Sequence, residues 1–327
     1  EMKNKKILEI KDLKVFYEPS SSFFTKKSSI KAVNGIDINI NQGETFGLVG
    51  ESGSGKSTVA KAILKLVKTS SGKINIEGED LLNLKGKKLR NKQKNIGAIF
   101  QDPYSSLNPR MKIKDIISEP LKVQGKKNLH EDVKKLLKMV GLNESMDTRF
   151  PHEFSGGQRQ RIGIARAVST NPKLIICDEP VSALDVSVQA QILNLLKDLQ
   201  KKLNISYLFI AHDLSVVKYL SAKIAVMYLG KIVEMASSEN IFSNPLHPYT
   251  KILINSVPSP DPRSERKKKF NPIKGDIPSA ANPPSGCVFR TRCPNPTDEC
   301  RKGNSEMGLL EIEPGHWVDK CCIKCSY

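Results

Sequence analysis

The feature that most constrains the fold is a glycine-rich motif at residues 50–57, with the sequence GESGSGKS. A short apolar run at residues 45–49 precedes it, and apolar residues recur at helical spacing after it, as far as Leu66 or Val67. Strand, glycine loop and helix in that order predict a phosphate-binding loop, in which backbone N–H groups converge on phosphate oxygens at a helix N-terminus. A glycine-rich turn that binds nothing is the alternative, which the Lys-Ser pair at residues 56–57 disfavours.

The same motif assigns roles to individual side chains. We expect Lys56 to reach the β- and γ-phosphates of a nucleotide such as ATP, and the Ser57 hydroxyl to bind Mg²⁺. The other residues expected to surround the phosphates are Gly50, Ser52, Gly53, Ser54, Gly55 and Thr58.

An apolar run at residues 174–177 ends in two carboxylates, Asp178 and Glu179. Asp178 is expected to hold Mg²⁺ through water, and Glu179 is the candidate general base for water that attacks the γ-phosphate. An apolar strand that ends in acidic residues is structural more often than not. The catalytic interpretation therefore depends on the presence of the motif at residues 50–57. Cys177, within the run, is predicted to be a small buried apolar residue.

Four further motifs are Gln101 in FQDP, FSGGQ at residues 154–158, SALD at residues 182–185 and His212 in AHD. Their order is that of ABC transporters, and the chain resembles the nucleotide-binding subunit of that family. The resemblance identifies them as the Q-loop, signature motif, D-loop and switch histidine. It implies an ATPase of the α/β class, with a RecA-like P-loop NTPase core, an antiparallel β subdomain and a helical subdomain.

The resemblance also implies what these residues do. Gln101 would bind Mg²⁺ and act with Glu179 and His212 in hydrolysis, while Tyr17 would stack on adenine, with Phe16 as the competing candidate. The signature residues, which would face ATP held by the opposite subunit, are Ser155, Gly156, Gly157 and Gln158. They precede a helical apolar pattern, so they also suit an anion-binding helix N-terminus. A plain N-cap, a structural histidine and a core or surface aromatic are the alternatives.

Between residues 101 and 154 the pattern changes from strands to helices. Two amphipathic sets predict helices, and Gly141 ends the second. Their apolar positions are Ile113, Ile116, Ile117 and Leu121, then Val133, Leu136, Leu137 and Val140. We expect a helical subdomain at about residues 102–168, within an ATPase cassette of residues 1–240. By resemblance, the segment at residues 104–110 would touch coupling helices of the membrane subunits; a plain surface loop is the alternative.

Charge and hydropathy limit the function classes. The chain has 52 basic and 34 acidic residues, a formal net charge of +18, which raises nucleic-acid binding as a rival. The basic runs at residues 85–92 and 266–269 contain no aromatic residues, so a lysine-rich solvated surface, near anionic lipid headgroups, is preferred and no nucleic-acid partner is expected. No apolar run approaches the roughly 18 residues that span a bilayer, and no signal segment is evident at the start. We expect a soluble, unexported protein at the cytoplasmic face of the membrane.

Three segments resemble the ATP-binding subunits of oligopeptide and dipeptide permeases: residues 244–250 with His-Pro-Tyr, residues 150–154 and residues 185–190. The resemblance implies peptide import with a homologous ATP-binding subunit, which makes a heterodimer, two transmembrane permease subunits and an extracytoplasmic binding protein. An insertion at residues 20–29 favours the F-type over the D-type subunit. Import of another small solute such as nickel, and a soluble ABC ATPase acting on ribosomes or DNA, are the alternatives.

Six of the seven cysteines lie in the C-terminal extension, residues 241–327, which is expected to form a small cysteine-rich domain. Because a reducing cytosol disfavours disulfides, metal or cluster ligation is the leading interpretation. The family resemblance of residues 286–294 favours a [4Fe-4S] cluster with a structural or docking role. Its proposed ligands are Cys287, Cys293, Cys300 and Cys321, with Cys322 and Cys325 also considered for the fourth. A zinc site and buried free thiols are the competing interpretations.

Overall fold

The computed structural model describes residues 5–18, 29–257, 275–301 and 308–322. Most of the predicted insertion at residues 20–29, the basic run at 266–269 and Cys325 lie outside the described residues. The chain divides into two compact units. The first comprises Glu1–Glu9, Asn39–Thr45 and Asn75–Ile210, and the second comprises Ile10–Ile38, Phe46–Ile74 and Ala211–Tyr327.

The first unit contains three parallel strands in the order β6, β7, β8. Their bounds are Ile96–Ile99, Leu174–Asp178 and Ser206–Ala211. Ile99 lies opposite Cys177, and Asp178 lies opposite Ile210. All of β8 and all but the last residue of β7 are buried, as expected for parallel strands covered on both faces. Cys177 is fully buried, which confirms the prediction made for it.

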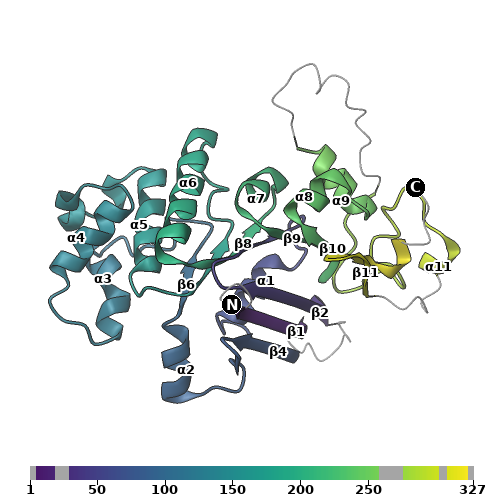
Figure 1. Cartoon of the computed structure of the whole chain (residues 1–327), viewed down its shortest axis with the longest axis horizontal. Coiled ribbons are helices and arrows are strands. Elements are labelled where there is room, and N and C mark those ends of the chain that lie inside the picture. The colour runs from purple at the N-terminus through teal and green to yellow at the C-terminus, as the bar shows by residue number, and fades with distance from the viewer. Residues whose placement is uncertain (1–4, 19–28, 258–274, 302–307, 323–327) are drawn as a thin grey trace, which may run out of the picture. The chain divides into compact units, whose positions relative to one another are not determined.

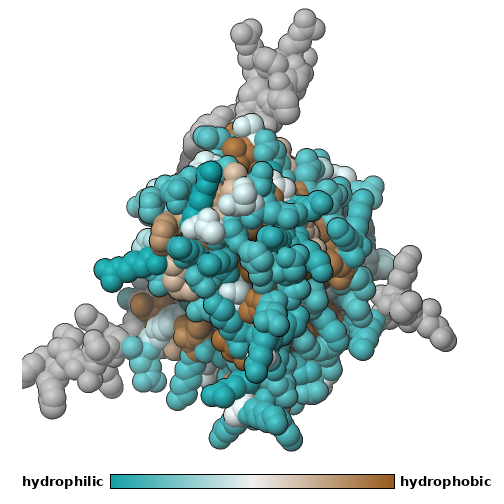
Figure 2. Space-filling view, turned by 90° about the vertical axis from the view of Figure 1, so that its left-hand side faces the viewer, coloured by the Kyte–Doolittle hydropathy of each residue, from teal (hydrophilic) through white to brown (hydrophobic). Residues whose placement is uncertain are grey.

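Helices of the first unit follow the predicted amphipathic pattern. α3 packs against α4 and α5, and these three lie side by side in Figure 1. Every predicted apolar position from Ile113 to Val140 is buried. Figure 2 views this side of the molecule, where hydrophobic residues form small separate patches on a mostly hydrophilic surface, as expected for helices that bury one face. The helices are α2 (Gly86–Gln93), α3 (Ile113–Val123), α4 (His130–Met139), α5 (Gly156–Val168) and α6 (Val186–Leu203), with the short 3₁₀ turns η2 (Glu144–Thr148) and η3 (Pro151–Glu153).

The second unit contains a mixed sheet. β3 is parallel to β9, and antiparallel pairing continues from β9 to β10, from β10 to β12 and from β12 to β11. The last hairpin therefore extends the same sheet, and a separate cysteine-rich domain is not evident among the described residues. The strands are β3 (Thr45–Val49), β9 (Lys223–Tyr228), β10 (Lys231–Ser237), β11 (Leu309–Glu313) and β12 (His316–Asp319). The helices are α1 (Lys56–Ile63), α7 (Leu214–Leu220), α8 (Ser238–Ser243), α9 (Pro248–Asn255), α11 (Asp298–Arg301) and the turn η4 (Lys320–Cys322).

Helix α1 is shorter than the sequence pattern predicted. It ends at Ile63, because Lys65 adopts a left-handed conformation with φ of 57°. Leu66 is consequently 62% exposed and does not continue the apolar face of the helix.

Four strands lie near the start of the chain. β1 (Lys6–Tyr17) and β2 (Ile30–Asn41) have residues in both units, as does β4 (Ser71–Ile76). In the first unit, the end of β4 pairs antiparallel with β5 (Glu79–Asp80). The inward residues of β1 and β2, such as Leu8, Val15 and Ile38, are fully buried, in the alternation expected of half-buried strands.

The His-Pro-Tyr segment starts helix α9. His247 Nδ1 accepts a hydrogen bond from Tyr249 N at 3.1 Å, and Pro248 occupies the first helical position, where its missing N–H costs nothing. The backbone N–H of His247 donates to the buried Glu234 of β10 at 2.9 Å, and Glu234 also contacts His316 of β12 at 2.8 Å. Complete burial lowers the pKa of His247 to about 3, so its ring is neutral near pH 7.

No helix in the described part of the chain combines the length and the apolar character required to cross a membrane.

Candidate active site

The loop at residues 50–57 connects β3 to α1 in the second unit, as predicted. Gly50, Gly53 and Gly55 have φ angles of 153°, 79° and 109°. A Cβ at Gly50 would lie 2.1 Å from Met227 O, and one at Gly55 would lie 2.1 Å from Ala32 O. These two positions therefore require glycine for their conformation and for the close approach of neighbouring backbone.

Lys56 is the first residue of α1 and is 4% exposed. Its Nζ donates to Gly50 O at 2.7 Å and to Glu51 O at 2.9 Å, so the loop's own carbonyls hold the ammonium against the loop. A buried cation beside a helix N-terminus makes this end of the loop strongly attractive to an anion.

Three further observations indicate that phosphate fits the loop. Ser54 Oγ is buried and has no hydrogen-bond partner among the described residues. A Cβ at Gly53 would meet nothing within 4 Å, and α1 has no side-chain N-cap hydrogen bond in the described structure, because its N-cap residue is Gly55. Ser52 and Gly53 are exposed, whereas Ser57 and Thr58 are half-buried.

Acidic residues at the end of β7 belong to the first unit. Glu179 lies directly after the strand with φ of 50°, a left-handed conformation that is unusual for a residue with a side chain and costs of order 1–3 kcal/mol. Its N–H donates to Ile210 O at 2.9 Å, which fixes the residue against β8. Strain of this kind concentrates at functional positions.

Gln101 and Glu179 are brought together although they are far apart in the sequence. Gln101 Nε2 donates to Glu179 Oε2 at 2.9 Å. The side chain predicted as general base is thus oriented by the side chain predicted as the Q-loop glutamine. Ser182, at the start of the predicted D-loop, donates from its hydroxyl to Glu179 O at 3.1 Å.

The predicted signature residues begin helix α5. Ser155 Oγ accepts from Gln158 N at 3.3 Å and Gln158 Oε1 accepts from Ser155 N at 3.0 Å, which together form a capping box. A Cβ at Gly157 would lie 2.5 Å from Val188 Cγ1 of α6, so close helix packing requires glycine there. Gly156 has more room, because a Cβ there would lie 3.5 Å from Leu184 Cδ2.

Two arginines of α5 contact the segment that follows Gln101. No role was predicted for them from the sequence. Arg166 Nη1 donates to Ser106 O at 2.7 Å, and Arg159 lies 3.6 Å over the ring of Tyr104. Burial lowers the pKa of Arg166, an effect that Glu119 opposes. The sequence signal covers only Arg159, which follows the signature residues in the FSGGQRQR stretch, whereas Arg166 lies beyond that stretch.

His212 and Tyr17 lie in the second unit. His212 follows β8 and is exposed, while the neighbouring Asp213 caps α7 by accepting from Ser215 N at 2.7 Å. Tyr17 ends β1 and is 39% exposed, and Phe16 beside it is half-buried with Lys31 Nζ 6.0 Å from its ring centroid. Tyr17 therefore offers the more accessible ring.

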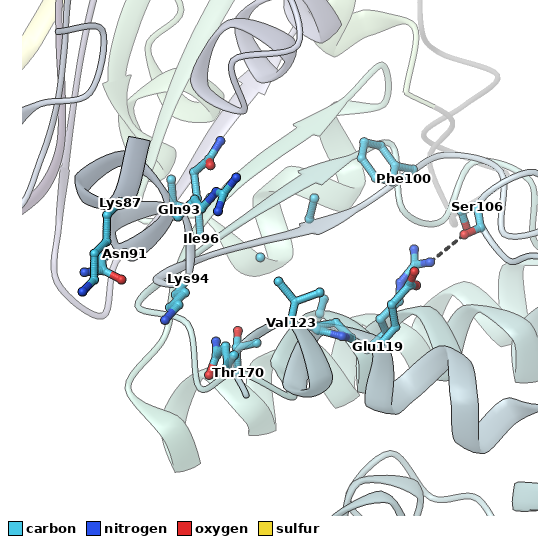
Figure 3. A pocket seen from close by; sticks show the side chains of 17 residues that line it. Lys87, Asn91, Gln93, Lys94, Ile96, Phe100, Ser106, Glu119, Val123 and Thr170 are labelled. Carbon is cyan, nitrogen blue, oxygen red and sulfur yellow. Dashed lines mark hydrogen bonds between the residues drawn. The ribbon is translucent and has the colours of Figure 1, made fainter. Parts of the chain in front are cut away.

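A pocket of about 750 Å³ opens in the first unit beside the segment that follows Gln101. Figure 3 shows Lys87 and Asn91 from α2, with Lys94 just after it, on one side and Glu119 and Val123 from α3 on the other. Val123 is 81% exposed, and Phe100 also lines the pocket with an exposed ring. An apolar floor with a basic rim suits a protein partner that carries apolar and acidic side chains.

Four C-terminal cysteines have described side chains in the second unit, and one of them, Cys322, is half-buried. Cys287 and Cys300 are buried and Cys293 is half-buried, and Cys287 N donates to Cys300 O at 3.2 Å. Thr297 Oγ1 lies 3.2 Å from Cys300 Sγ. The side chain of Cys321 is outside the described part. Among the described residues, no group of three or more Cys, His, Asp or Glu is arranged to hold a metal ion.

Comparisons with known proteins agree with the motifs. The family described as ABC transporter matches residues 33–182, and the family described as oligopeptide/dipeptide transporter, C-terminal region, matches residues 233–300. The putative oligopeptide transport ATP-binding protein YkfD of Bacillus subtilis is 50% identical over 97% of this chain and 95% of its own length. The oligopeptide transport ATP-binding protein OppF of Salmonella typhimurium is 53% identical over 90% of this chain and 91% of its own length.

Solved structures extend the comparison to the fold. A dimeric post-hydrolysis structure of the ATP-binding cassette MJ0796 bound to ADP and Pi has a TM-score of 0.63 and 28% identity, and the match covers 71% of this chain and 98% of that one. CbiO1 from Clostridium perfringens, part of the ABC transporter complex cbiONQ, has a TM-score of 0.63 and 27% identity over 74% of this chain and 92% of that one.

Proposed function

The chain belongs to the oligopeptide transport ATP-binding proteins of the ABC transporter family, and from this premise we infer that it hydrolyses ATP to power peptide import. The observation that carries the substrate class is the match of residues 233–300 to the C-terminal region of oligopeptide and dipeptide transporters. This match supports a peptide as the substrate because the matched region lies outside the ATPase motifs. Similarity to the OppF protein favours the F-type of subunit.

For ATP, the second unit supplies the phosphate-binding groups. Lys56, held in the loop by Gly50 O and Glu51 O, has a third ammonium N–H with which it donates to phosphate oxygens. Ser54 Oγ and the N–H groups at the start of α1 donate to the same oxygens. Tyr17 offers an exposed ring for the adenine, and His212 an exposed imidazole for the γ-phosphate.

For hydrolysis, the first unit supplies the base. Glu179 accepts a proton from the attacking water while Gln101 holds Oε2 through its amide. Ser57 and Gln101 are the side chains that would bind Mg²⁺, with Asp178 acting through water. When bound, Mg²⁺ neutralises charge on the phosphates.

We assign the signature residues to the nucleotide of a second, homologous subunit. Ser155 and the first N–H groups of α5 form a helix N-terminus, which suits an anion. A dimeric cassette structure is among the structures that resemble this chain. The isolated chain should therefore bind ATP yet hydrolyse it slowly, and adding the partner subunit should raise the rate.

The pocket in Figure 3 is assigned to the permease subunits, together with the adjacent segment at residues 104–110. Lys87, Arg90 and Lys94 give its rim a positive charge, and Val123 and Phe100 give it exposed apolar surface. These features support contact with coupling helices, a contact that was predicted from the sequence for residues 104–110 alone. Two permease subunits and an extracytoplasmic binding protein complete the assembly, with this chain at the cytoplasmic face of the membrane.

A [4Fe-4S] cluster on Cys287, Cys293, Cys300 and Cys321 is a further proposal. The hydrogen bond between Cys287 N and Cys300 O, which brings two of these positions together, supports it. The described residues by themselves do not form a metal site, so no functional step is assigned to the cluster. Anaerobic purification with iron and acid-labile sulfide assays tests it, and zinc without sulfide would contradict it.

Peptide dependence of the ATPase tests the proposed function. The assembled transporter should be purified with its partner subunit, permease subunits and binding protein in lipid, and phosphate release measured with and without a mixture of short peptides. We expect peptides to stimulate hydrolysis. Stimulation by nickel and not by peptides, or ATP hydrolysis that no solute changes, would contradict the proposal.

A further inference from the structure

Arg292, in the C-terminal extension, forms a two-pronged ion pair with Glu51, the second residue of the phosphate-binding loop. Nη1 lies 2.6 Å from Oε2, and Nη2 lies 3.0 Å from Oε1. Both residues belong to the second unit. The arginine side chain is 6% exposed and the glutamate 24% exposed, so the pair is largely shielded from water, where paired charge-assisted hydrogen bonds are strong.

All polar groups of Glu51 are held by neighbours. Its N–H donates to the Tyr249 hydroxyl at 2.8 Å, and its carbonyl accepts from Lys56 Nζ at 2.9 Å and Ser54 N at 3.2 Å. The carboxylate is held by Arg292. Two of these partners come from the C-terminal extension, 198 and 241 residues away in sequence. The extension thus fixes the residue whose carbonyl positions Lys56.

The partners of Glu51 are mounted on one aromatic cluster. Tyr228, at the end of β9, packs edge to face on Tyr249 at 4.9 Å and on Phe289 at 5.2 Å between ring centroids. Arg292 lies 5.7 Å from the Tyr228 ring centroid and donates to its hydroxyl at 3.4 Å. β9 pairs with β3, the strand that leads into the phosphate-binding loop. The aromatic cluster therefore connects these strands to Arg292, which holds Glu51.

Charge explains why the pairing affects an anionic ligand. Glu51 carries its carboxylate on the loop that binds phosphate. An uncompensated negative charge on that loop disfavours a triphosphate, by an amount that grows as the dielectric falls. Arg292 neutralises that carboxylate and holds it in a fixed position. The ion pair therefore both fixes the conformation of the loop and reduces its negative charge.

We propose that Arg292 is a positioning residue for nucleotide binding, which acts through Glu51 to hold the phosphate-binding loop and to neutralise its carboxylate. This rests on the proposed function, since it presumes that the loop binds ATP. It gives the C-terminal extension, including the Tyr of the His-Pro-Tyr segment, a role at the nucleotide.

The test compares MgATP affinity of the full-length chain by calorimetry, with melting temperature measured in parallel. We expect Arg292→Met to weaken MgATP binding about tenfold, the effect of losing a charge-assisted pair and exposing a like charge to the ligand. The double variant Glu51→Gln with Arg292→Met should bind MgATP more tightly than Arg292→Met alone, because it removes the repelling carboxylate. If Arg292 had only a structural role, the double variant would bind MgATP more weakly than Arg292→Met.

Arg290→Met is the matched control. Arg290 is two residues away and donates to Ser285 Oγ at 3.2 Å, so its loss removes the same charge without touching the loop. Its MgATP affinity should stay within about twofold of wild type. Arg292→Lys keeps the charge without the fork and should weaken binding about two- to threefold, which provides a test if Arg292→Met does not fold.

Wild-type affinity in Arg292→Met or Arg292→Lys, an equal loss in Arg290→Met, or a double variant weaker than Arg292→Met would overturn the inference while leaving the proposed function intact. A wild-type chain that bound no MgATP would overturn the proposed function and this inference together.

Discussion

Replacing the predicted general base, Glu179, should lower the rate of ATP hydrolysis without changing the stability of the fold. Glu179→Gln keeps the length and shape of the side chain, and its amide oxygen accepts the hydrogen bond that Gln101 Nε2 now donates to Oε2 at 2.9 Å. The left-handed backbone at φ of 50° carries the same strain with either side chain. We therefore expect an unchanged melting temperature and unchanged ATP affinity.

The rate of hydrolysis should fall steeply. A positioned general base contributes about 10²- to 10⁴-fold, so phosphate release by the assembled transporter should drop to about 1% of wild type or less, with ATP retained on the protein. Gln101→Leu is the matched control, because it removes the donor but keeps the carboxylate. Its rate should lie between wild type and Glu179→Gln.

Two results would refute this reasoning. Glu179→Gln that turns over at more than about a tenth of the wild-type rate would assign the base to another group. A melting temperature that falls together with the rate would mean that the carboxylate is needed for the fold and not only for catalysis.

Three further predictions test the structure. Ser155→Ala removes the cap contact to Gln158 N and should lower the free energy of unfolding by about 1 kcal/mol in denaturant titration, whereas Ser155→Asp should retain most of it. Ile117→Ala, at a fully buried position of α3, should cost about 2–5 kcal/mol by the same measurement, against less than about 0.5 for the exposed Lys122→Ala. His247 has a folded pKa of about 3, below its value of 6.5 when unfolded, so its contribution is complete above pH 6.5 and is lost as pH falls toward 3, by up to about 1.4 kcal/mol per pH unit. His247→Asn keeps an acceptor for Tyr249 N but cannot gain that proton, so its stability should fall less steeply between pH 6.5 and pH 4; equal slopes would contradict the assignment.

Local patterns predicted the parts of the fold that depend on neighbouring residues. The run before residue 50 is a buried strand, and the apolar positions from Ile113 to Leu121 form the buried face of α3, because periodicity alone determines which side of a helix is apolar. The end of α1 was mispredicted, since the left-handed Lys65 carries no glycine signal. Glu179 gave no sign of its positive φ for the same reason.

Contacts between distant segments could not be predicted from the pattern. Glu51 reads as an unspecified position of the loop, and its partner Arg292 lies 241 residues further along the chain. The buried Glu234 and His316 look like ordinary surface residues until β12 pairs with β10. The link between Gln101 and Glu179 was expected only as a shared function, and the hydrogen bond between them depends on the pairing of β6 with β7.

Uptake of a labelled short peptide tests the central claim most directly. The assembled transporter would be reconstituted in vesicles with ATP on the side of this chain and with the peptide and binding protein on the other, and accumulation measured for wild type and Glu179→Gln. We predict ATP-dependent accumulation with wild type and none above the no-ATP background with the variant. Accumulation that is equal in the two, or that needs no ATP, would contradict the claim that hydrolysis by this chain powers peptide import.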